Sequence, residues 1–198
     1  MEKRLINKLI EIGISEPEGN FSTEEIALIE KEYEITLPDD YKEFLQKYGG
    51  TYITRDGAFV SEHNSKSYCA TFYGSSDNQD SLKRNIEEYL ERMPSSIIPF
   101  ADADGGDKLC IGVKGDAFRK IYFWNHEKEL EAYRMLNPDK TFPSIDNYWN
   151  NLEIVANSLT EFILSYKIEE KATENITSNV EAVFSDKLLE MLKNRKNE

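Results

Sequence analysis

The sequence predicts an α+β domain in which helices cover one face and the edges of an antiparallel sheet. Three observations point to this class. Apolar residues keep helical spacing in the first 48 residues, strand-like runs dominate from 96 to 124, and short connections between those runs favour antiparallel pairing. Hydrophobic residues make up 39% of the chain and aromatic residues 12%, which is enough to bury a real core.

The N-terminal part predicts two helices and a turn. The first helix spans 1–14 and is amphipathic, and turn-forming residues follow it over 15–20. The second helix spans 23–34, where Ser22 and Glu25 form a capping box. Its apolar face consists of residues at helical spacing, namely Ile26, Ile29 and Tyr33.

A third helix is predicted over 38–48, the best-marked segment of the chain. Pro38 suits the first turn, because an N–H at that position has no helical partner in any case. Two aspartates follow where the helix dipole favours negative charge, and Gly49 and Gly50 end the helix. An aromatic and aliphatic stripe lies along one face, formed by Tyr41, Phe44, Leu45 and Tyr48. This pattern indicates a helix that docks, not one that catalyses.

The next part of the chain predicts a hairpin, a strand and a helix. Asp56 and Gly57, flanked by strand-forming residues, favour a hairpin turn within 51–60. The run 67–73 is rich in strand formers. A helix is predicted over 77–93, because its apolar residues keep helical spacing and a proline stops it.

Three further strands are predicted, at 96–101, 108–113 and 120–124. The stretch 127–156 carries two prolines and several aromatic residues, and we expect a partly ordered excursion over the sheet. A second capping box, Ser158 with Glu161, opens a helix that continues through Tyr166.

The chain is therefore divided into three parts. Residues 1–21 form an N-terminal helix and turn, 22–166 form the domain, and 167–198 form an extension. The extension begins as a polar linker, and then apolar residues return at helical spacing: Val183, Phe184, Leu188, Leu189, Met191 and Leu192. We expect an amphipathic C-terminal helix that packs back on the domain, and the alternative is that it binds a groove of a partner.

The chain is acidic, with a net charge of -13. Residues 167–198 hold seven acids and six bases, a charge of -1, so residues 1–166 carry -12. A surface of this kind repels nucleic acid and anionic lipid, and it attracts basic partners over long distances. Solubility alone also explains such a charge.

The cysteines and the N-terminus predict a cytoplasmic protein. Cys69 and Cys110 lie in strand-like runs, and we expect two buried, free thiols in a reducing compartment. Neither a CxxC pair nor a cysteine and histidine at zinc spacing is present. The first residues lack the long apolar core of a signal peptide, and no window reaches the length of a membrane span.

Asp102, Asp104 and Asp107 form the one segment that suggests a metal. Their alternation is typical of the start of a calcium loop, but the loop's glycine position is Asp107 and its last position is Val113. A turn between two strands accounts for the two glycines of this segment. We therefore predict no metal site.

Catalytic signals are also lacking. The two histidines, His63 and His126, have no neighbouring serine, cysteine or aspartate arranged as in a catalytic triad. Neither of the common phosphate-binding glycine motifs occurs. The sequence thus predicts no catalytic residue and no cofactor.

Three segments taken in order resemble one known family. They are Leu37–Gly50, Ile98–Val113 and Ser158–Tyr166, which span most of the chain. Together they resemble the SUKH superfamily, specifically its Smi/Knr branch, which is named for a yeast regulator of cell-wall glucan synthesis. The resemblance implies an immunity protein that neutralises a toxin, because bacterial members are mostly regarded in this way. It also implies that the Asp102–Asp107 turn is structural or faces a partner.

The strand Ile121–Trp124 is the densest aromatic run. Alternate residues of a strand face opposite sides, so either Ile121 and Phe123 or Tyr122 and Trp124 enter the core. The other pair is available as binding anchors unless helices or the 127–156 excursion cover that face.

The first hypothesis is therefore a non-enzymatic immunity protein that occludes the active site of a basic toxin. The residues predicted to bind the partner are Asp56, Asp102, Asp104, Asp107, Asp116, Tyr122 and Trp124. A second hypothesis is a regulatory scaffold for a cell-wall or signalling enzyme, and a third is an unrecognised enzyme that uses His63 or His126. The sequence sets neither the partner nor the oligomeric state.

Overall fold

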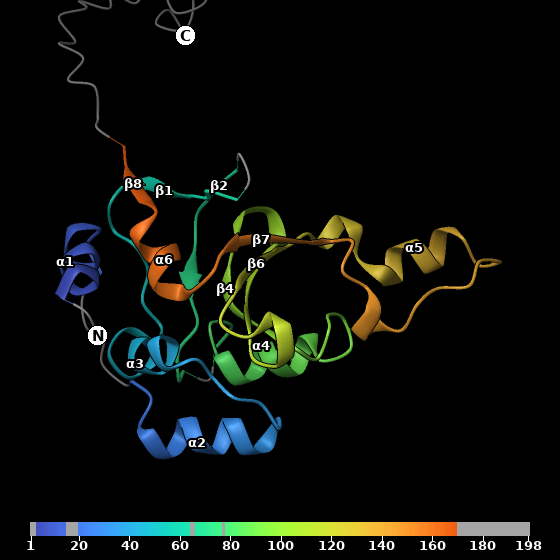
Figure 1. Cartoon of the computed structure of the whole chain (residues 1–198), viewed down its shortest axis with the longest axis horizontal. Coiled ribbons are helices and arrows are strands. Elements are labelled where there is room, and N and C mark those ends of the chain that lie inside the picture. Colours follow the sequence, from blue (N-terminus) through green and yellow to red (C-terminus); the bar gives the residue numbers. More distant parts are fainter. Residues whose placement is uncertain (1–2, 15–19, 64–65, 77, 170–198) are drawn as a thin grey trace, which may run out of the picture.

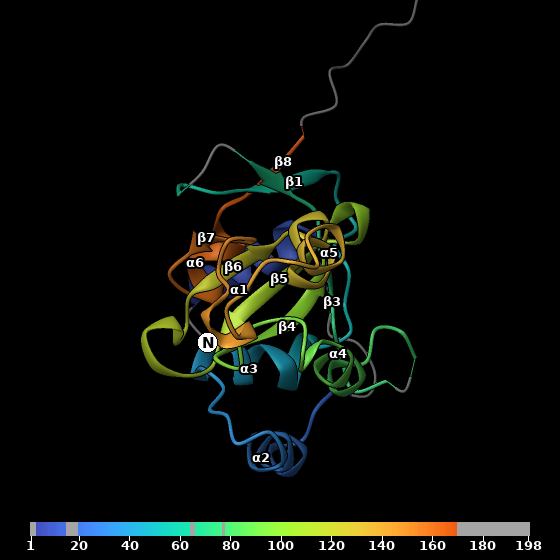
Figure 2. The ribbon, with the colours of Figure 1, turned by 90° about the vertical axis from the view of Figure 1, so that its right-hand side faces the viewer.

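A five-stranded antiparallel sheet forms the centre of this protein (Figure 2). The computed structural model describes residues 3–14, 20–63, 66–76 and 78–169. The strands follow the order β3-β4-β5-β6-β7 and are β3 (Thr71–Phe72), β4 (Ile97–Asp102), β5 (Lys108–Gly112), β6 (Ile121–Trp124) and β7 (Leu152–Ala156). The three strands predicted between 96 and 124 are confirmed as β4, β5 and β6, and they pair antiparallel.

A second sheet of three strands lies at one end of the molecule, at the top of Figure 1. Its order is β2-β1-β8, with β1 (Gly57–Val60), β2 (Ser67–Tyr68) and β8 (Tyr166–Ile168). The hairpin predicted within 51–60 is wrong, because β1 pairs with β2 and β8, whereas Tyr52 bridges to Thr71 of the larger sheet. Gly57 pairs with Ile168, a separation along the chain that local turn signals do not report. The single strand predicted over 67–73 is divided between the two sheets.

The described residues contain six α-helices: α1 (Lys3–Glu11), α2 (Thr23–Glu32), α3 (Asp39–Tyr48), α4 (Leu82–Tyr89), α5 (Leu130–Leu136) and α6 (Leu159–Leu164). The capping box of α2 is confirmed, since Ser22 Oγ accepts from Glu25 N at 3.1 Å and Glu25 Oε2 accepts from Ser22 N at 2.7 Å. Ser158 caps α6 in the same way, but the Glu161 carboxylate accepts from the amide of Asn157 instead. No helix in the described ranges has both the length and the apolar character that crossing a membrane requires.

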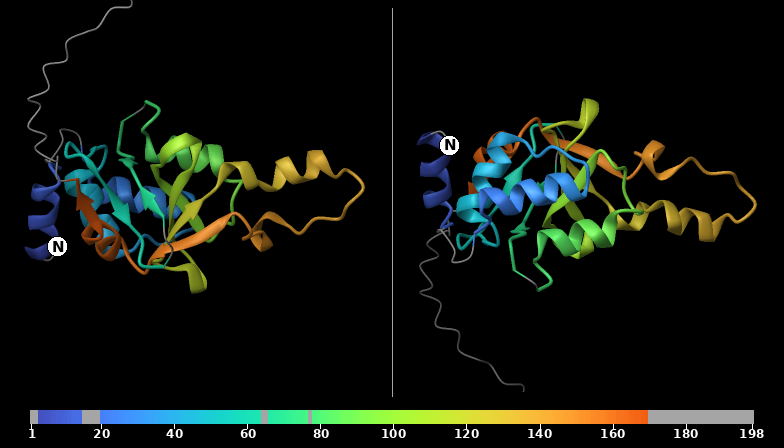
Figure 3. Two further views of the ribbon diagram at one scale, coloured as in Figure 1. Left: turned by 90° about the horizontal axis from the view of Figure 1, so that it is seen from above. Right: turned by 90° about the horizontal axis from the view of Figure 1, so that it is seen from below.

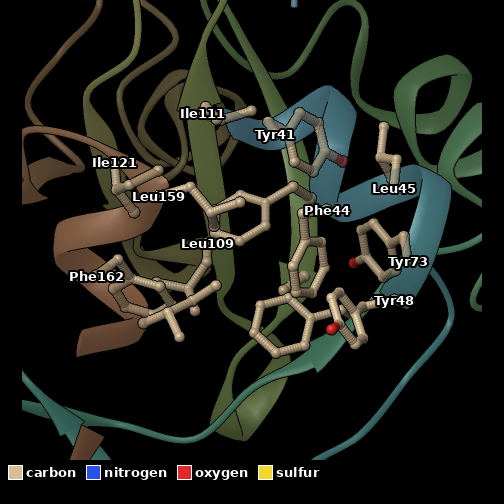
Figure 4. Close-up of a cluster of buried hydrophobic side chains, with 14 of the residues drawn as sticks. Tyr41, Phe44, Leu45, Tyr48, Tyr73, Leu109, Ile111, Ile121, Leu159 and Phe162 are labelled. Atoms are coloured by element: carbon tan, nitrogen blue, oxygen red, sulfur yellow. The ribbon is translucent and has the colours of Figure 1, made fainter. Parts of the chain in front are cut away.

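The main core lies between one face of the larger sheet and helices α3 and α6 (Figure 4). The stripe predicted on α3 points into this core, and all four of its residues are buried. From the opposite side, Phe162 of α6 stacks on Phe59 of β1 with ring centroids 4.0 Å apart. Figure 4 shows Leu109 and Ile121 of the sheet between the two helices. The smaller sheet, α1 and α2 contribute the remaining sides of this cluster.

A second apolar cluster covers the other face of the sheet. Ile121 and Phe123 face the main core, whereas Tyr122 and Trp124 face this second cluster. The residues packed with them come from α4 and the turn after it, from β4, β5 and the turn before β6, and from the chain that enters β7: Tyr89, Met93, Ile97, Cys110, Ala117, Trp149 and Leu152. Helix α4 lies at the edge between the two clusters, because Leu82 and Ile86 belong to the first.

The stretch between β6 and β7 forms an arm that projects from the sheet (Figures 1 and 3). The expectation of an excursion over the sheet is wrong for most of its length, because only its base is buried. Arg92 and Glu129 join the arm to the end of α4 through two hydrogen bonds, of 2.6 and 3.0 Å. Asp146 accepts from the Ser95 amide at 2.8 Å, and the Tyr148 hydroxyl donates to the carbonyl of Lys128. Helix α5 was not predicted, because it is short and leaves large apolar residues exposed.

A close approach of two chain segments follows the end of α3. Of the two glycines expected to end this helix, Gly50 has the left-handed conformation, with φ 77°, whereas Gly49 does not, with φ -59°. Gly74 faces Gly50, and a Cβ placed on Gly74 would lie 2.6 Å from Gly50 Cα. Gly74 also donates to Asp80 O and accepts from Leu82 N, so this contact connects the end of α3 to the start of α4.

The edges of the larger sheet are covered by other parts of the chain. At β7, the Ser61 hydroxyl donates to the carbonyl of Val155 at 2.9 Å, and Lys66 binds Glu153 at 2.8 Å. At β3, the amide of Phe72 donates to the carbonyl of Thr51. The C-terminal helix predicted around 183–192 lies outside the described residues.

Candidate protein-binding surface

Asp102 is placed in a polar cluster within the protein. It lies at the end of β4, where its carboxylate binds the ammonium of Lys108 and accepts from the Tyr73 hydroxyl at 2.6 Å. Lys108 also donates to Tyr73 Oη at 3.0 Å. Burial lowers the pKa of Lys108, but the hydrogen bond and the charge of Asp102 outweigh it and raise that pKa. The carboxylate of Asp102 is thus already paired with groups of the protein itself.

Asp107 also has partners within the fold. Its carboxylate accepts from the backbone amide of His126 at 3.0 Å and lies 2.7 Å from His126 Nδ1. These contacts fix the turn between β4 and β5 against the turn after β6. Asp107 and Asp102 therefore fit the structural role that was weighed for this turn.

Asp104 and Asp56 remain exposed, with Asp104 near the thiol of Cys69 and Asp56 near the ring of Tyr166. Cys69 is exposed and free, which corrects the expectation of two buried thiols. Burial first, and then the charge of Asp104 and its hydrogen bond, raise the pKa of Cys69. The charge of Asp56 contributes, with that of Glu169, to raising the pKa of the neighbouring Tyr166, for which burial is the main cause. The structure thus brings two of the predicted acids to one acidic end of the molecule.

Asp116 lies apart from the other acids. It belongs to a 3₁₀ turn, Gly115–Ala117, between β5 and β6, whereas Asp104 lies between β4 and β5 at the opposite end of the strands. Its side chain is exposed, and its charge contributes to raising the pKa of Tyr122 after burial. The seven predicted residues therefore do not form one site.

Tyr122 and Trp124 require a correction, since neither ring is a surface anchor. Trp124 is fully buried and Tyr122 is 6% exposed. Trp149, which follows the arm, packs edge-on against Tyr122 with centroids 5.5 Å apart, and Tyr89 does the same to Trp124 at 5.3 Å. Cover by helices and by the 127–156 segment is the alternative that the structure supports.

The aspartate-rich turn is a turn in the structure as well. A short 3₁₀ segment, Asp104–Gly106, joins β4 to β5, and its glycines take φ values of 74° and 94°. Ala103 N closes it by donating to Asp107 O at 3.0 Å. Among the described residues, no group of histidine, cysteine or acidic side chains is arranged to hold a metal ion.

His63 lies beside a cavity of about 350 Å³ between α6, β1 and β7. Its Nε2 lies 3.3 Å from Glu161 Oε1 and 3.2 Å from Asn157 Nδ2. The nearby hydroxyls are engaged elsewhere, because Ser158 caps α6 and Ser61 binds Val155 O. No hydroxyl is oriented here by the histidine ring within the described residues, so the geometry offers no activated nucleophile.

A groove between α2 and α4, which the sequence did not indicate, is a further concave surface. Its cavity of about 380 Å³ has walls from α2 and α4 and a floor at Gly74 and Ser75. Leu28 of α2 lines it with 62% of its surface exposed. Further along α4, a smaller hollow of about 60 Å³ is lined by Tyr33, and Leu90 stands there 53% exposed.

Acidic side chains dominate the α2 wall of this groove. The lining carboxylates are Glu25 and Glu32 from α2 and Glu87 from α4. Hydrogen bonds from Ser22 lower the pKa of Glu25, which keeps it ionised. Lys83 on the α4 wall is paired with Glu32 at 3.0 Å. The signal that could have shown this surface is Leu28 itself, which falls outside the apolar stripe of its helix amid glutamates.

The fold defines an α+β domain of the SUKH class. The family model described as "SMI1 / KNR4 family (SUKH-1)" matches residues 20–165, so this chain belongs to that family. The chain is also 30% identical over 161 residues to the "SPbeta prophage-derived uncharacterized protein YokK" of Bacillus subtilis (strain 168). That similarity covers 73% of each chain.

Proposed function

We propose that this protein is an immunity protein that binds a basic toxin and blocks its active site. The observation that carries the proposal is the family match over residues 20–165, since bacterial SUKH proteins are mostly regarded as immunity proteins. The proposal needs only a binding surface, because occlusion of a toxin requires no chemistry by the blocking protein.

The charge of the chain supports a basic partner. Residues 1–166 carry -12, and acids remain exposed at both ends of the larger sheet and along α2. Summed charge of one sign accelerates the encounter with an oppositely charged protein and suppresses binding to acidic ones. Enzymes that act on nucleic acid often carry a basic substrate site. The negative potential of this chain attracts a surface of that kind.

The test is co-expression with the toxin-like protein encoded nearest to this gene. We expect this protein to protect a bacterial host from the growth arrest that the toxin causes. We also expect the two proteins to co-purify as a complex that weakens between low and moderate salt. Absence of both protection and co-purification would refute the proposal. A stable complex with a cell-wall or signalling enzyme, without protection, would instead support the regulatory scaffold.

A further inference from the structure

We propose that the groove between α2 and α4 binds an amphipathic segment of the partner that carries lysine or arginine. This inference rests on the proposed function and names both the surface and the chemistry that fits it. It differs from the sequence-based prediction, which placed the partner at the Asp102–Asp107 turn and at Tyr122 and Trp124.

The apolar part of the argument is the exposure of two leucines. Leu28 lines the larger hollow, which lies between α2 and α4, and Leu90 lines the smaller one. The smaller hollow lies between the end of α4 and β4, next to Tyr33 at the end of α2. An apolar side chain in a concave surface gains more on binding than one on a convex surface, because a partner excludes water from it on several sides. The partner segment must therefore present apolar side chains to these two positions.

The polar part of the argument is charge complementarity. Helix α2 carries four glutamates and one lysine between Thr23 and Glu32. Glu25, Glu32 and Glu87 line the groove, and Lys83, one of its two lining bases, is already paired with Glu32. Cations on the polar face of a bound segment would lie beside these carboxylates.

The groove is formed before any partner binds. Tyr33 donates to Glu87 Oε1 at 3.1 Å and so holds α2 to α4 at one end. Glu30 on the other face of α2 accepts from the amide of Leu37 and binds Lys42, which fixes α2 to the start and first turns of α3. A surface fixed in this way loses little conformational entropy on binding.

The chain's own C-terminal segment is the competing occupant. The described chain ends at Glu169 after β8, beside β1, whereas α2 lies at the opposite side of the molecule (Figure 1). Helix α2, which forms one wall of the groove, therefore lies on the opposite side of the molecule from the point at which that segment leaves the domain (Figure 1), and this placement favours a partner.

The experiment titrates the full-length protein with fluorescent helical peptides of about 16 residues, long enough to follow both hollows. One peptide has leucine at every third or fourth position and lysine on the other face. In two matched peptides, serine replaces leucine or glutamate replaces lysine. We expect only the first to bind, with an affinity that falls as salt is raised from about 50 to about 300 mM.

Variants of the protein locate the site. Leu28→Ser is expected to weaken binding about tenfold, whereas Leu136→Ser, which changes an even more exposed leucine on the arm, leaves it unchanged. Glu87→Gln keeps the acceptor for Tyr33 but removes a charge, so we expect about threefold weaker binding. Arg84→Gln removes a positive charge that repels the cationic peptide, so this substitution is expected to strengthen binding.

Three results would overturn the inference. One is equal binding by wild-type protein and Leu28→Ser, and another is equal binding of the serine-substituted peptide, which would indicate unspecific charge attraction. The third is an affinity gain of about tenfold when residues 180–198 are deleted, which would assign the groove to the chain's own segment.

The co-expression assay tests the proposed immunity function separately from the groove. If Leu28→Ser protects the host as well as the wild type does, the toxin binds elsewhere and only the groove inference fails. If the wild type gives no protection, the proposed function fails whatever the peptides show.

Discussion

Gly74 lies so close to the backbone of Gly50 that a side chain has no room at position 74. A Cβ on Gly74 would lie 2.6 Å from both the Cα and the backbone nitrogen of Gly50. The contact brings the end of α3 to the start of α4. It gives a packing reason for the glycine at position 74, whereas Gly50 is favoured by its φ of 77°.

Gly74→Ala should therefore destabilise the fold strongly. The added methyl group meets backbone atoms that cannot turn aside, and such overpacking costs about 2–3 kcal/mol in free energy of unfolding. Urea denaturation measures this value. Gly115→Ala is the control, because its Cβ meets nothing, and its φ of 54° alone should cost about 1 kcal/mol. Equal effects of the two substitutions would contradict the steric explanation.

Loss of the hydroxyl group should affect the free energy of unfolding differently at two buried tyrosines. Tyr41 Oη has no hydrogen-bond partner among the described residues, so Tyr41→Phe should leave the free energy of unfolding unchanged or raise it. Tyr73 Oη contacts both Asp102 and Lys108, so Tyr73→Phe should lower it by about 1–2 kcal/mol. Denaturation of both variants with the same urea series provides the comparison. A larger loss for Tyr41→Phe would refute the assignment.

The protein should lose stability in alkaline solution. Burial raises the pKa of Tyr41 and, together with a hydrogen bond to Asp102, that of Tyr73, both above the ordinary value of 10.0. Burial likewise raises the pKa of Cys110 above 9.0. The unfolded chain therefore releases these protons first, so the stability they provide is complete below about pH 9 and declines as the pH rises further.

Thermal melts at steps between about pH 8 and about pH 11 would record this decline. Ultraviolet absorption of tyrosinate should show the exposed tyrosines titrating first and the buried ones only with unfolding. Full titration of all tyrosines while the fold persists would count against the prediction.

Cys69 and Cys110 should differ in reactivity toward a thiol reagent. Cys110 is fully buried, whereas Cys69 is exposed but has a pKa raised by burial and by Asp104. Because the thiolate is the reactive form, Cys69 should react alone and more slowly than a free thiol at neutral pH. Asp104→Asn should accelerate it by about two- to threefold. Cys69→Ser, which should remove all fast labelling, is the control.

The arm should loosen when its link to α4 is cut. Arg92 binds both carboxylate oxygens of Glu129 and stacks on the ring of Tyr89 at 4.4 Å. Arg92→Met should cost about 1 kcal/mol, because the pair is partly solvated, and should speed amide exchange over 126–150. Arg134→Met, which removes an exposed pair with Glu131 at the tip, should do neither. Unchanged exchange in the first variant would show that the anchor lies elsewhere.

Local periodicity was sufficient to predict the elements whose partners are near in sequence. The α3 stripe, the Ser22 capping box and the three strands β4, β5 and β6 were predicted for this reason. The hairpin within 51–60 was not, because Gly57 pairs with Ile168 of β8. Strands so far apart in sequence pair only when the whole chain folds, and the residues of a local turn give no signal of that pairing.

The candidate surface was harder to predict than the fold. The burial of Trp124 depends on Tyr89 and on the segment that returns from the arm, which have no local relation to β6. Asp102 was predicted to bind a partner, but it forms an ion pair with Lys108, its neighbour across the β4–β5 turn. Leu28 indicates a binding surface because α4 lies opposite α2, and this arrangement cannot be derived from the sequence of α2 alone.

The covered edges of the larger sheet bear on how the protein can be stored in a cell. A carbonyl of β7 already accepts from Ser61, and an amide of β3 already donates to Thr51. A strand from another molecule would have to displace these groups before it could extend the sheet, and open edges are the usual route to aggregation. The two covered edges therefore disfavour such joining of sheets when the protein accumulates in a cell.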